Sequence, residues 1–157
     1  MKETENTKHQ KLKLDITKTG AEPTLLVERI RKAKRVYLIG NGGSAANSIH
    51  ICNDLLACGI RAYTLDAATL TASANDYGYH TVFARWIKTV GEKGDLLVAL
   101  SGSGTSRNIT LAIREAKKRG LDTVLVTDYL RTRDMQQSEE DQLWLGHELM
   151  RALRDRS

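Results

Sequence analysis

Several sequence features are scarce or missing in this chain, and each absence excludes a class of protein. Its 157 residues include only two cysteines, Cys52 and Cys58, which are too few for the disulfide framework of a small secreted domain. No apolar run approaches the roughly 20 residues of a membrane-spanning helix. The polar, lysine-rich N-terminus does not have the pattern of a signal peptide. We therefore expect a cytoplasmic protein without membrane association.

Two nucleotide-binding signatures are also missing. The chain has no G-x-x-x-x-G-K-[ST] motif of P-loop hydrolases, and neither of its glycine loops fits the dinucleotide fingerprint G-x-G-x-x-G. The net charge of +5 is compatible with nucleic-acid binding, but the basic residues are spread along the chain without interleaved aromatic residues. An anionic small substrate suits this charge equally well, so charge alone does not decide the function. We expect no nucleic-acid partner.

The chain does contain an alternation of short apolar runs and amphipathic segments, without internal repeats or low-complexity tracts. This alternation predicts a doubly wound (flavodoxin-like) α/β fold, in which a parallel sheet is sandwiched by helices. The strands are expected at 36–39, 62–65, 96–100 and 123–126, with 36–39 and 96–100 as central neighbours. Helices are expected at 23–34, 45–56, 66–75, 79–90, 107–119 and 138–154. Residues 23–157 would form one domain, preceded by a flexible arm over residues 1–22.

The stretch 35–54, RVYLIGNGGSAANSIHICND, is the first candidate for a site. An apolar strand ends at a glycine-rich turn, and Ser44 follows as a plausible N-cap of a helix. Such a turn presents free backbone N–H groups and a positive dipole end to an anion. His50 and Asp54 are four residues apart and would share one face of that helix. The alternative is an ordinary tight connection between a strand and a helix.

A second polar loop, Ser101-Gly102-Ser103-Gly104-Thr105-Ser106, directly follows the apolar run 96–100. Its hydroxyl groups, its backbone N–H groups and the start of the next helix would form a nest for a phosphate monoester without any lysine. In an open α/β sheet, ligands bind outside the carboxyl ends of the strands. We therefore expect this loop and the loop at 40–44 to share a ligand, the alternative being a solvated serine-rich turn.

In combination, these motifs resemble the sugar isomerase (SIS) domain family. The resemblance rests on Gly40-Asn41-Gly42-Gly43-Ser44, His50, Asn75-Asp76 and Ser101-x-Ser103-Gly104-x-Ser106, and it is clear over residues 30–128. Within the family the chain looks most like the bacterial phosphoheptose isomerases, which interconvert sedoheptulose 7-phosphate and D-glycero-D-manno-heptose 7-phosphate. The substrate-binding residues that the resemblance implies are Asn41, Gly42, Gly43, Ser44, Asn75, Asp76, Ser101, Gly102, Ser103 and Ser106.

The resemblance also implies a zinc site, with one divalent ion per subunit. Its ligands would be His50, Asp54, Glu139 and His147. The family has glutamate at the position of Asp54 and glutamine at the position of Glu139. Two imidazoles and two carboxylates suit zinc. Aldose–ketose isomerisation needs a base that moves a proton between adjacent carbons and an acid or metal that stabilises the enediolate. Asp54 and His147 are the acid/base candidates.

The sequence thus predicts a metal-assisted sugar-phosphate isomerase that forms a homo-oligomer, a tetramer or a dimer. The oligomer is expected because the apolar residues of 23–34 and of the last helix exceed what one small sheet can cover, and because the family assembles through such helices. One alternative is a non-catalytic SIS module that binds a phosphosugar or a protein. A nucleic-acid binder, which would rest on net charge alone, is the weakest alternative.

Overall fold

Four parallel strands form one sheet at the centre of the fold, in the order β2-β1-β3-β4. The computed structural model describes residues 23–127 and 134–155, and the predicted arm over residues 1–22 lies outside them. The strands are β1 (Val36–Gly40), β2 (Ala62–Thr64), β3 (Leu96–Ser101) and β4 (Asp122–Thr127). Val36 is paired with both Ala62 and Leu96, so β1 and β3 are the central neighbours that the sequence predicted.

The two central strands are buried on both faces, as expected for a parallel sheet covered by helices. Successive side chains point to opposite faces. Val36 and Leu38 therefore belong to one core cluster, and Tyr37 and Ile39 belong to the other. Continuous apolar runs, rather than alternating ones, are the sequence pattern that this double burial requires.

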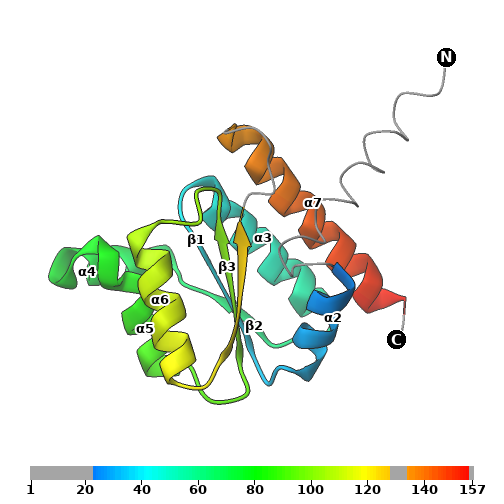
Figure 1. Ribbon diagram of the computed structural model, residues 1–157, viewed down its shortest axis with the longest axis horizontal. Helices are drawn as coiled ribbons and strands as arrows, with labels where there is room; N and C mark the ends of the chain where they lie inside the picture. Colours follow the sequence, from blue (N-terminus) through cyan, green and yellow to red (C-terminus); the bar gives the residue numbers. More distant parts are fainter. Residues whose placement is uncertain (1–22, 128–133, 156–157) are drawn as a thin grey trace.

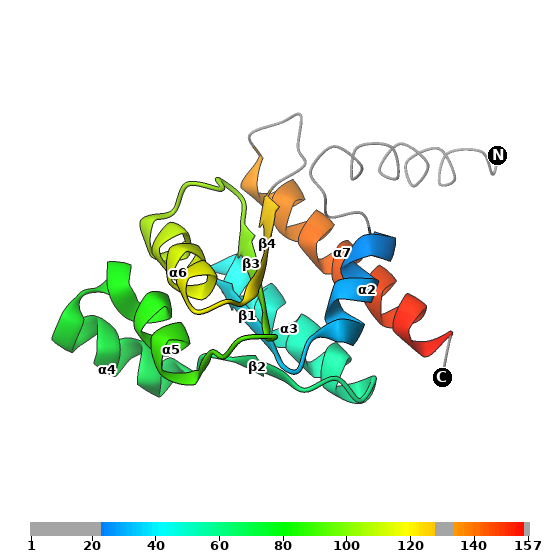
Figure 2. The same cartoon turned by 60° about the horizontal axis from the view of Figure 1, so that its bottom comes forward.

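Helices cover both faces of the sheet and make a three-layer α/β/α domain (Figures 1 and 2). One face carries α2 (Pro23–Lys32), α3 (Gly43–Ala57) and α7 (Met135–Arg154). The other carries α4 (Ala67–Tyr77), the 3-10 turn η2 (Tyr79–Thr81), α5 (Val82–Val90) and α6 (Arg107–Lys118). No helix among the described residues is long and apolar enough to cross a membrane. The predicted doubly wound class is confirmed.

Three local predictions differ from the structure. Ser44 is not an N-cap: α3 begins one residue earlier, at Gly43, and its cap is Gly42, whose φ of +55° favours glycine. The segment 75–77, predicted to be part of a polar turn, is the last turn of α4, which ends at Gly78. The last helix begins at Met135 rather than 138, because the Asp134 carboxylate caps it by accepting from the Gln136 N–H.

Helices α3 and α7 run side by side in the same direction, and their contact places the candidate site. Near the start of α3, the Asn47 side chain donates to the Glu139 carbonyl at 2.8 Å. Further along, Ile51 meets Gly146, and a Cβ on this glycine would overlap the Ile51 side chain. Because Gly146 has no side chain, α3 and α7 approach closely at this residue, which directly precedes His147.

Candidate functional site

The two polar loops meet at the carboxyl ends of β1 and β3. A small cavity of about 50 Å³ lies between them, lined by Asn41, Ser44, Leu100, Ser101, Gly102, Ser103, Ser106 and Met135. Six of these eight residues were predicted to bind substrate. Met135, from the first turn of α7, was not predicted, because the expected helix began three residues later.

Hydroxyl groups organise the second loop. Ser101 is buried, and its Oγ accepts from the Gly104 N–H at 3.0 Å. Ser103 Oγ accepts from the Thr105 N–H at 3.2 Å and lies 3.4 Å from Ser106 Oγ. The loop leads directly into α6, whose first residue is Arg107. A ring of hydroxyl groups beside a helix N-terminus is suited to an anion such as a phosphate.

A part-buried pair of asparagine amides joins the first loop to the start of α6. Asn41 Nδ2 donates to Asn108 Oδ1 at 2.9 Å, and Asn108 Nδ2 donates back to Asn41 Oδ1 at 2.8 Å. The Tyr79 hydroxyl donates to the same Asn41 oxygen at 2.6 Å. Sequence reasoning missed both Asn108 and Tyr79. Asparagine at the second position of a predicted helix, directly after a ligand loop, was the available signal for Asn108.

The predicted sugar contacts Asn75 and Asp76 are not brought to this cavity. Both are exposed at the end of α4, where Asn75 Nδ2 donates to Asp76 Oδ1 at 3.1 Å. Neither lines the cavity between the loops. Because α4 continues through Tyr77 instead of stopping before them, these two side chains belong to a regular helix end rather than to a turn aimed at the ligand.

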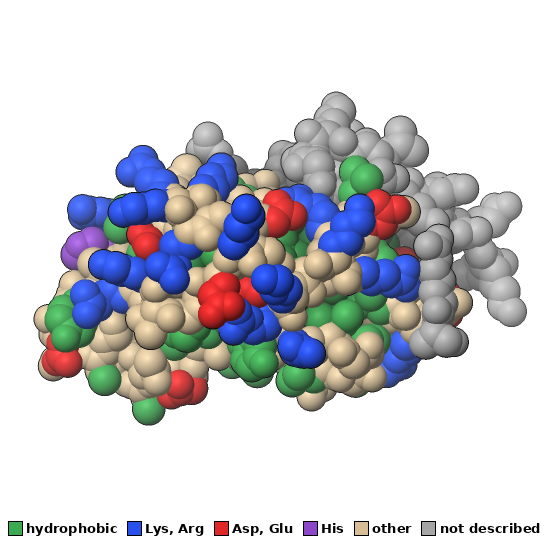
Figure 3. All heavy atoms as spheres, turned by 90° about the horizontal axis from the view of Figure 1, so that it is seen from below, with side chains coloured by type: hydrophobic (Ala, Val, Ile, Leu, Met, Phe, Trp, Pro, Cys, Tyr) green, Lys and Arg blue, Asp and Glu red, His purple; other side chains and the backbone are tan. Residues whose placement is uncertain are grey.

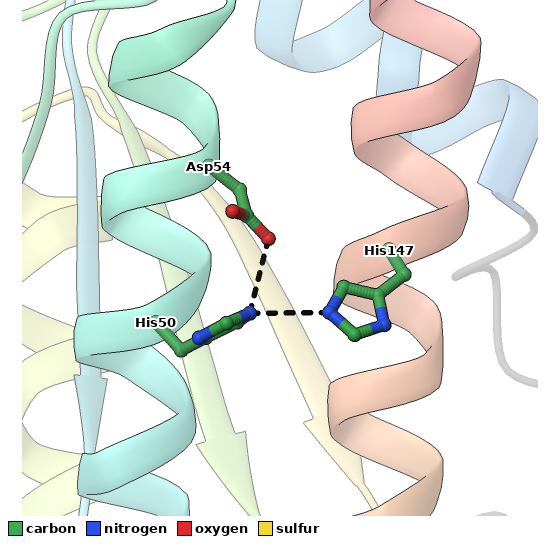
Figure 4. A group of neighbouring side chains, drawn as sticks. All are labelled: His50, Asp54 and His147. Carbon is green, nitrogen blue, oxygen red and sulfur yellow. Dashed lines mark hydrogen bonds and ion pairs between the residues drawn. The ribbon is translucent and has the colours of Figure 1, made fainter.

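Three of the four predicted metal ligands converge between α3 and α7 (Figure 4). Their ligand atoms all lie within 4.8 Å of one another. His50 Nε2 is 3.1 Å from His147 Nε2 and 3.3 Å from Asp54 Oδ2. The four-residue spacing of His50 and Asp54 places both on the face of α3 toward α7, and the parallel packing of the helices brings His147 to the same level.

The donor set of this cluster fits a divalent ion such as zinc. Asp54 Oδ2 is buried, and in the described structure it has no hydrogen-bond partner beyond its ion-pair contact with His50, an arrangement that is costly for a polar atom unless something binds it. Two nitrogens bound tetrahedrally to one zinc at about 2.0–2.1 Å would lie about 3.3 Å apart, close to the 3.1 Å between the imidazoles. Two imidazoles and one carboxylate make up the three-ligand set of many catalytic zinc sites. We conclude that this group could hold a metal.

Glu139 does not belong to this cluster, although the sequence grouped it there. A Cβ on Gly43 would overlap the Glu139 carboxylate, which therefore lies against the first residue of α3. Eight residues separate Glu139 from His147, or about 12 Å along a helix. Since α7 runs parallel to α3, Glu139 is level with the glycine loop and His147 is level with His50. A carboxylate at this helix N-terminus interacts favourably with the helix dipole.

Comparison with known proteins now identifies the family. A sequence model of the SIS domain matches residues 5–128. The chain belongs to the SIS domain family. This SIS domain is 43% identical to a phosphoheptose isomerase of Akkermansia muciniphila over 111 residues, which cover 66% of the chain and 59% of the relative. It is 34% identical to a phosphoheptose isomerase of Thermodesulfovibrio yellowstonii over 153 residues, which cover 83% of the chain and 76% of that relative.

The fold agrees with this family assignment. The structure of a phosphoheptose isomerase from Neisseria gonorrhoeae superimposes with a TM-score of 0.78 at 25% identity, covering 95% of this SIS domain and 94% of that chain. The resemblance to the SIS family that the motifs predicted is confirmed. The domain nevertheless spans less than two thirds of the Akkermansia relative, at 59% of its length.

Proposed function

We propose that this SIS domain is an aldose–ketose isomerase that converts sedoheptulose 7-phosphate to D-glycero-D-manno-heptose 7-phosphate. The observation that carries the proposal is the position of two sites on one helix. The serine loop adjoins the start of α3, and the His50 cluster lies about 10 Å further along the helix axis. This separation is comparable with the length of an extended heptose phosphate. The names of the relatives support the same reaction.

The phosphate would bind at the serine loop through the hydroxyl groups of Ser101, Ser103 and Ser106. The sugar hydroxyls would contact Asn41 and the backbone of 42–44. Asn41 is held in place from two sides by Asn108 and Tyr79, so its amide would be pre-oriented for a ligand. The loop groups would thus hold and orient the substrate without taking part in proton transfer.

His50, Asp54 and His147 would hold a divalent metal ion. When bound, such an ion acts as a Lewis acid that polarises a carbonyl oxygen. The sequence assigned acid/base roles to Asp54 and His147, but in this geometry both side chains are committed to the cluster. Glu139 is outside it and faces the glycine loop. Its carboxylate is the uncommitted candidate for the base, and in that role C1 and C2 of the substrate would lie between the glycine loop and the cluster.

The test is incubation with sedoheptulose 7-phosphate, with and without zinc, followed by NMR of the products. Glu139→Gln should bind zinc normally and lose turnover by a factor of about 10² or more, the usual contribution of a general base. Asp54→Asn should lose both zinc and turnover. Parent protein that forms no aldose in either condition would refute the isomerase. Glu139→Gln with full activity would return the base role to Asp54 or His147.

A phosphosugar-binding module without turnover is the second candidate, and one observation favours it. Aspartate at position 54 is one methylene shorter than the glutamate of the family, and in this structure its carboxylate stays against His50. A side chain that reaches less far would bind a metal without reaching substrate. Phosphosugar affinity that depends on Ser103, together with no detectable exchange, would support this function over the isomerase.

We also propose a homo-oligomer, on the basis of exposed apolar residues on the α2/α3 side. Leu25 of α2 is 49% exposed, and Ile49 and Leu56 of α3 are 58% and 53% exposed. Ile49 and Leu56 are seven residues apart and share one face of α3. Covering such side chains is favourable by roughly 25 cal/mol per Å². Sedimentation should give more than one subunit, whereas a monomer at micromolar concentration would refute this proposal.

A further inference from the structure

The end of the sheet opposite the candidate site is basic. A cation stands one to three residues before each strand: Arg61 before β2, Lys34 before β1, Lys93 before β3 and Arg119 before β4. Because the strands are parallel, all four positions lie at the same end of the sheet, where the strands begin. Together with Arg31 from the last turns of α2, we call these five residues the basic row. Figure 3 views this end and shows Lys and Arg across it, with fewer Asp and Glu.

Contacts show that members of the row are neighbours. Lys34 Nζ donates to the Lys93 carbonyl at 3.2 Å. Lys93 also adjoins the residue that follows Arg119, because a Cβ on Gly120 would lie 3.3 Å from Lys93 Cγ. Arg31, Lys34 and Arg61 line one groove of about 710 Å³. Adjacent strands are about 4.8 Å apart, so four strands give the row a length of about 14 Å.

The row carries a net positive charge because its members are not neutralised locally. Among the described residues, three carboxylates close to the row are engaged by arginines outside it. Arg35 binds Glu92 and Asp95, and Arg29 binds Asp122. Within residues 23–127 and 134–155, Arg31 donates only to main-chain carbonyls of α7, at 3.2 and 3.5 Å. No carboxylate partner is found in the described structure for any of the five cations of the row.

An aromatic ring adjoins these charges. Tyr63 lies on β2, an edge strand, lines the same groove as Arg31, Lys34 and Arg61, and is 44% exposed. A half-exposed aromatic ring beside a line of cations is the combination on which single-stranded nucleic acids bind, with bases stacking on the ring and phosphates following the charges. A duplex keeps its bases stacked internally and would not use such a ring.

We propose that the basic row and Tyr63 bind single-stranded nucleic acid. This site is separate from the phosphosugar site and does not depend on the proposed isomerase activity. The sequence predicted no nucleic-acid partner because the cations are scattered along the chain without interleaved aromatic residues. The fold gathers five cations at one end of the sheet beside Tyr63, which answers both reasons for that prediction.

The test is the fluorescence anisotropy of a labelled 12-nucleotide oligo(dT) titrated with the full chain between 25 and 200 mM NaCl. Single strands give a slope of log K against log [salt] of about −0.7 per neutralised phosphate, so three to five contacts predict about −2 to −3.5. The triple variant Arg31→Gln/Lys34→Gln/Arg61→Gln should reduce this slope by about 2. Tyr63→Leu should weaken binding at least about fivefold with an unchanged slope.

A matched control removes three cations outside the row: Arg85→Gln/Arg114→Gln/Arg151→Gln. It has the same net charge as the row variant and should retain the parent slope, and circular dichroism should show that all variants are folded. The proposal is overturned if the parent does not bind in a salt-dependent way, or if the control loses as much affinity as the row variant. Equal affinity for duplex, or no effect of Tyr63→Leu, would refute the single-strand assignment.

Discussion

The close contact between α3 and α7 at Gly146 makes a sharp prediction for Gly146→Ala. The new Cβ would overlap Ile51 Cγ1 and lie 3.0 Å from its Cδ1. Ile51 is only 4% exposed, so its side chain has little room to turn away. Carbon atoms prefer separations of about 3.5–4.0 Å, so either the helices must separate or Ile51 must leave its rotamer.

Two opposing effects set the magnitude. Alanine is favoured over glycine inside a helix by about 0.5–1 kcal/mol, whereas overpacking a core contact costs typically 1–3 kcal/mol. The expected net loss of unfolding free energy is therefore about 1 kcal/mol. The affinity for zinc should fall more than the stability does. Gly146 precedes His147 and Ile51 follows His50, while metal–ligand distances tolerate only about 0.2 Å. We expect zinc affinity to fall at least about tenfold.

Urea unfolding followed by circular dichroism gives the stability, and competition with a chelator gives the zinc affinity. Ile51→Ala is the matched background because it removes the two atoms that the new Cβ meets. Alone it should cost about 2–5 kcal/mol, but adding Gly146→Ala to it should be neutral or stabilising. A Gly146→Ala protein with the stability and zinc affinity of the parent would refute this account of the helix spacing.

Three further predictions follow from other contacts. Asn108→Ala should lower the unfolding free energy by about 1–3 kcal/mol, because it leaves the Asn41 amide without its paired partner; a urea titration measures this, and an unchanged midpoint would contradict it. The Arg29 guanidinium lowers the pKa of the Asp122 carboxyl, so this pair stabilises the fold above the unfolded pKa of about 3.9 and loses its effect as the pH falls through the lower folded value. Because both side chains are partly exposed, Asp122→Asn should cost only about 0.5–1 kcal/mol near pH 7, and melting curves should show the difference shrinking in acid rather than persisting. Zinc at 100 times its dissociation constant should stabilise the fold by about 2.7 kcal/mol, a melting shift that EDTA should reverse and that a His50→Ala variant should lack.

The fold was predictable because its signals are local. Apolar runs such as Leu96–Leu100, which is buried on both faces in the structure, are typical of strands in a covered parallel sheet. Loop positions at strand ends followed from the same topology. The ends of the helices were harder to predict from the sequence, because they depend on single capping contacts. The Asp134 cap moved the start of α7, and the absence of a break before Gly78 extended α4 through Asn75.

The candidate site was predictable where spacing along one helix sets the geometry. His50 and Asp54 share a face of α3 by periodicity alone. Which residues of α7 meet them depends on the lateral register of the two helices, and that register depends on contacts between them, such as Ile51–Gly146 and Asn47–Glu139, rather than on a short motif. The sequence therefore identified His147 only through the family resemblance, and in this structure Glu139 lies outside the group of His50, Asp54 and His147.

The two helix N-termini at the carboxyl edge of the sheet are not equivalent, and this difference would orient a bound phosphosugar. The start of α3 already carries a carboxylate, since Glu139 lies against Gly43. The start of α6 follows three serines and lies beside the cavity. A phosphate would be repelled from the first position and attracted to the second. The phosphate end of the proposed substrate would therefore lie at α6, and its carbonyl end would point along α3 toward Glu139 and the His50 cluster, where a base and a metal are needed.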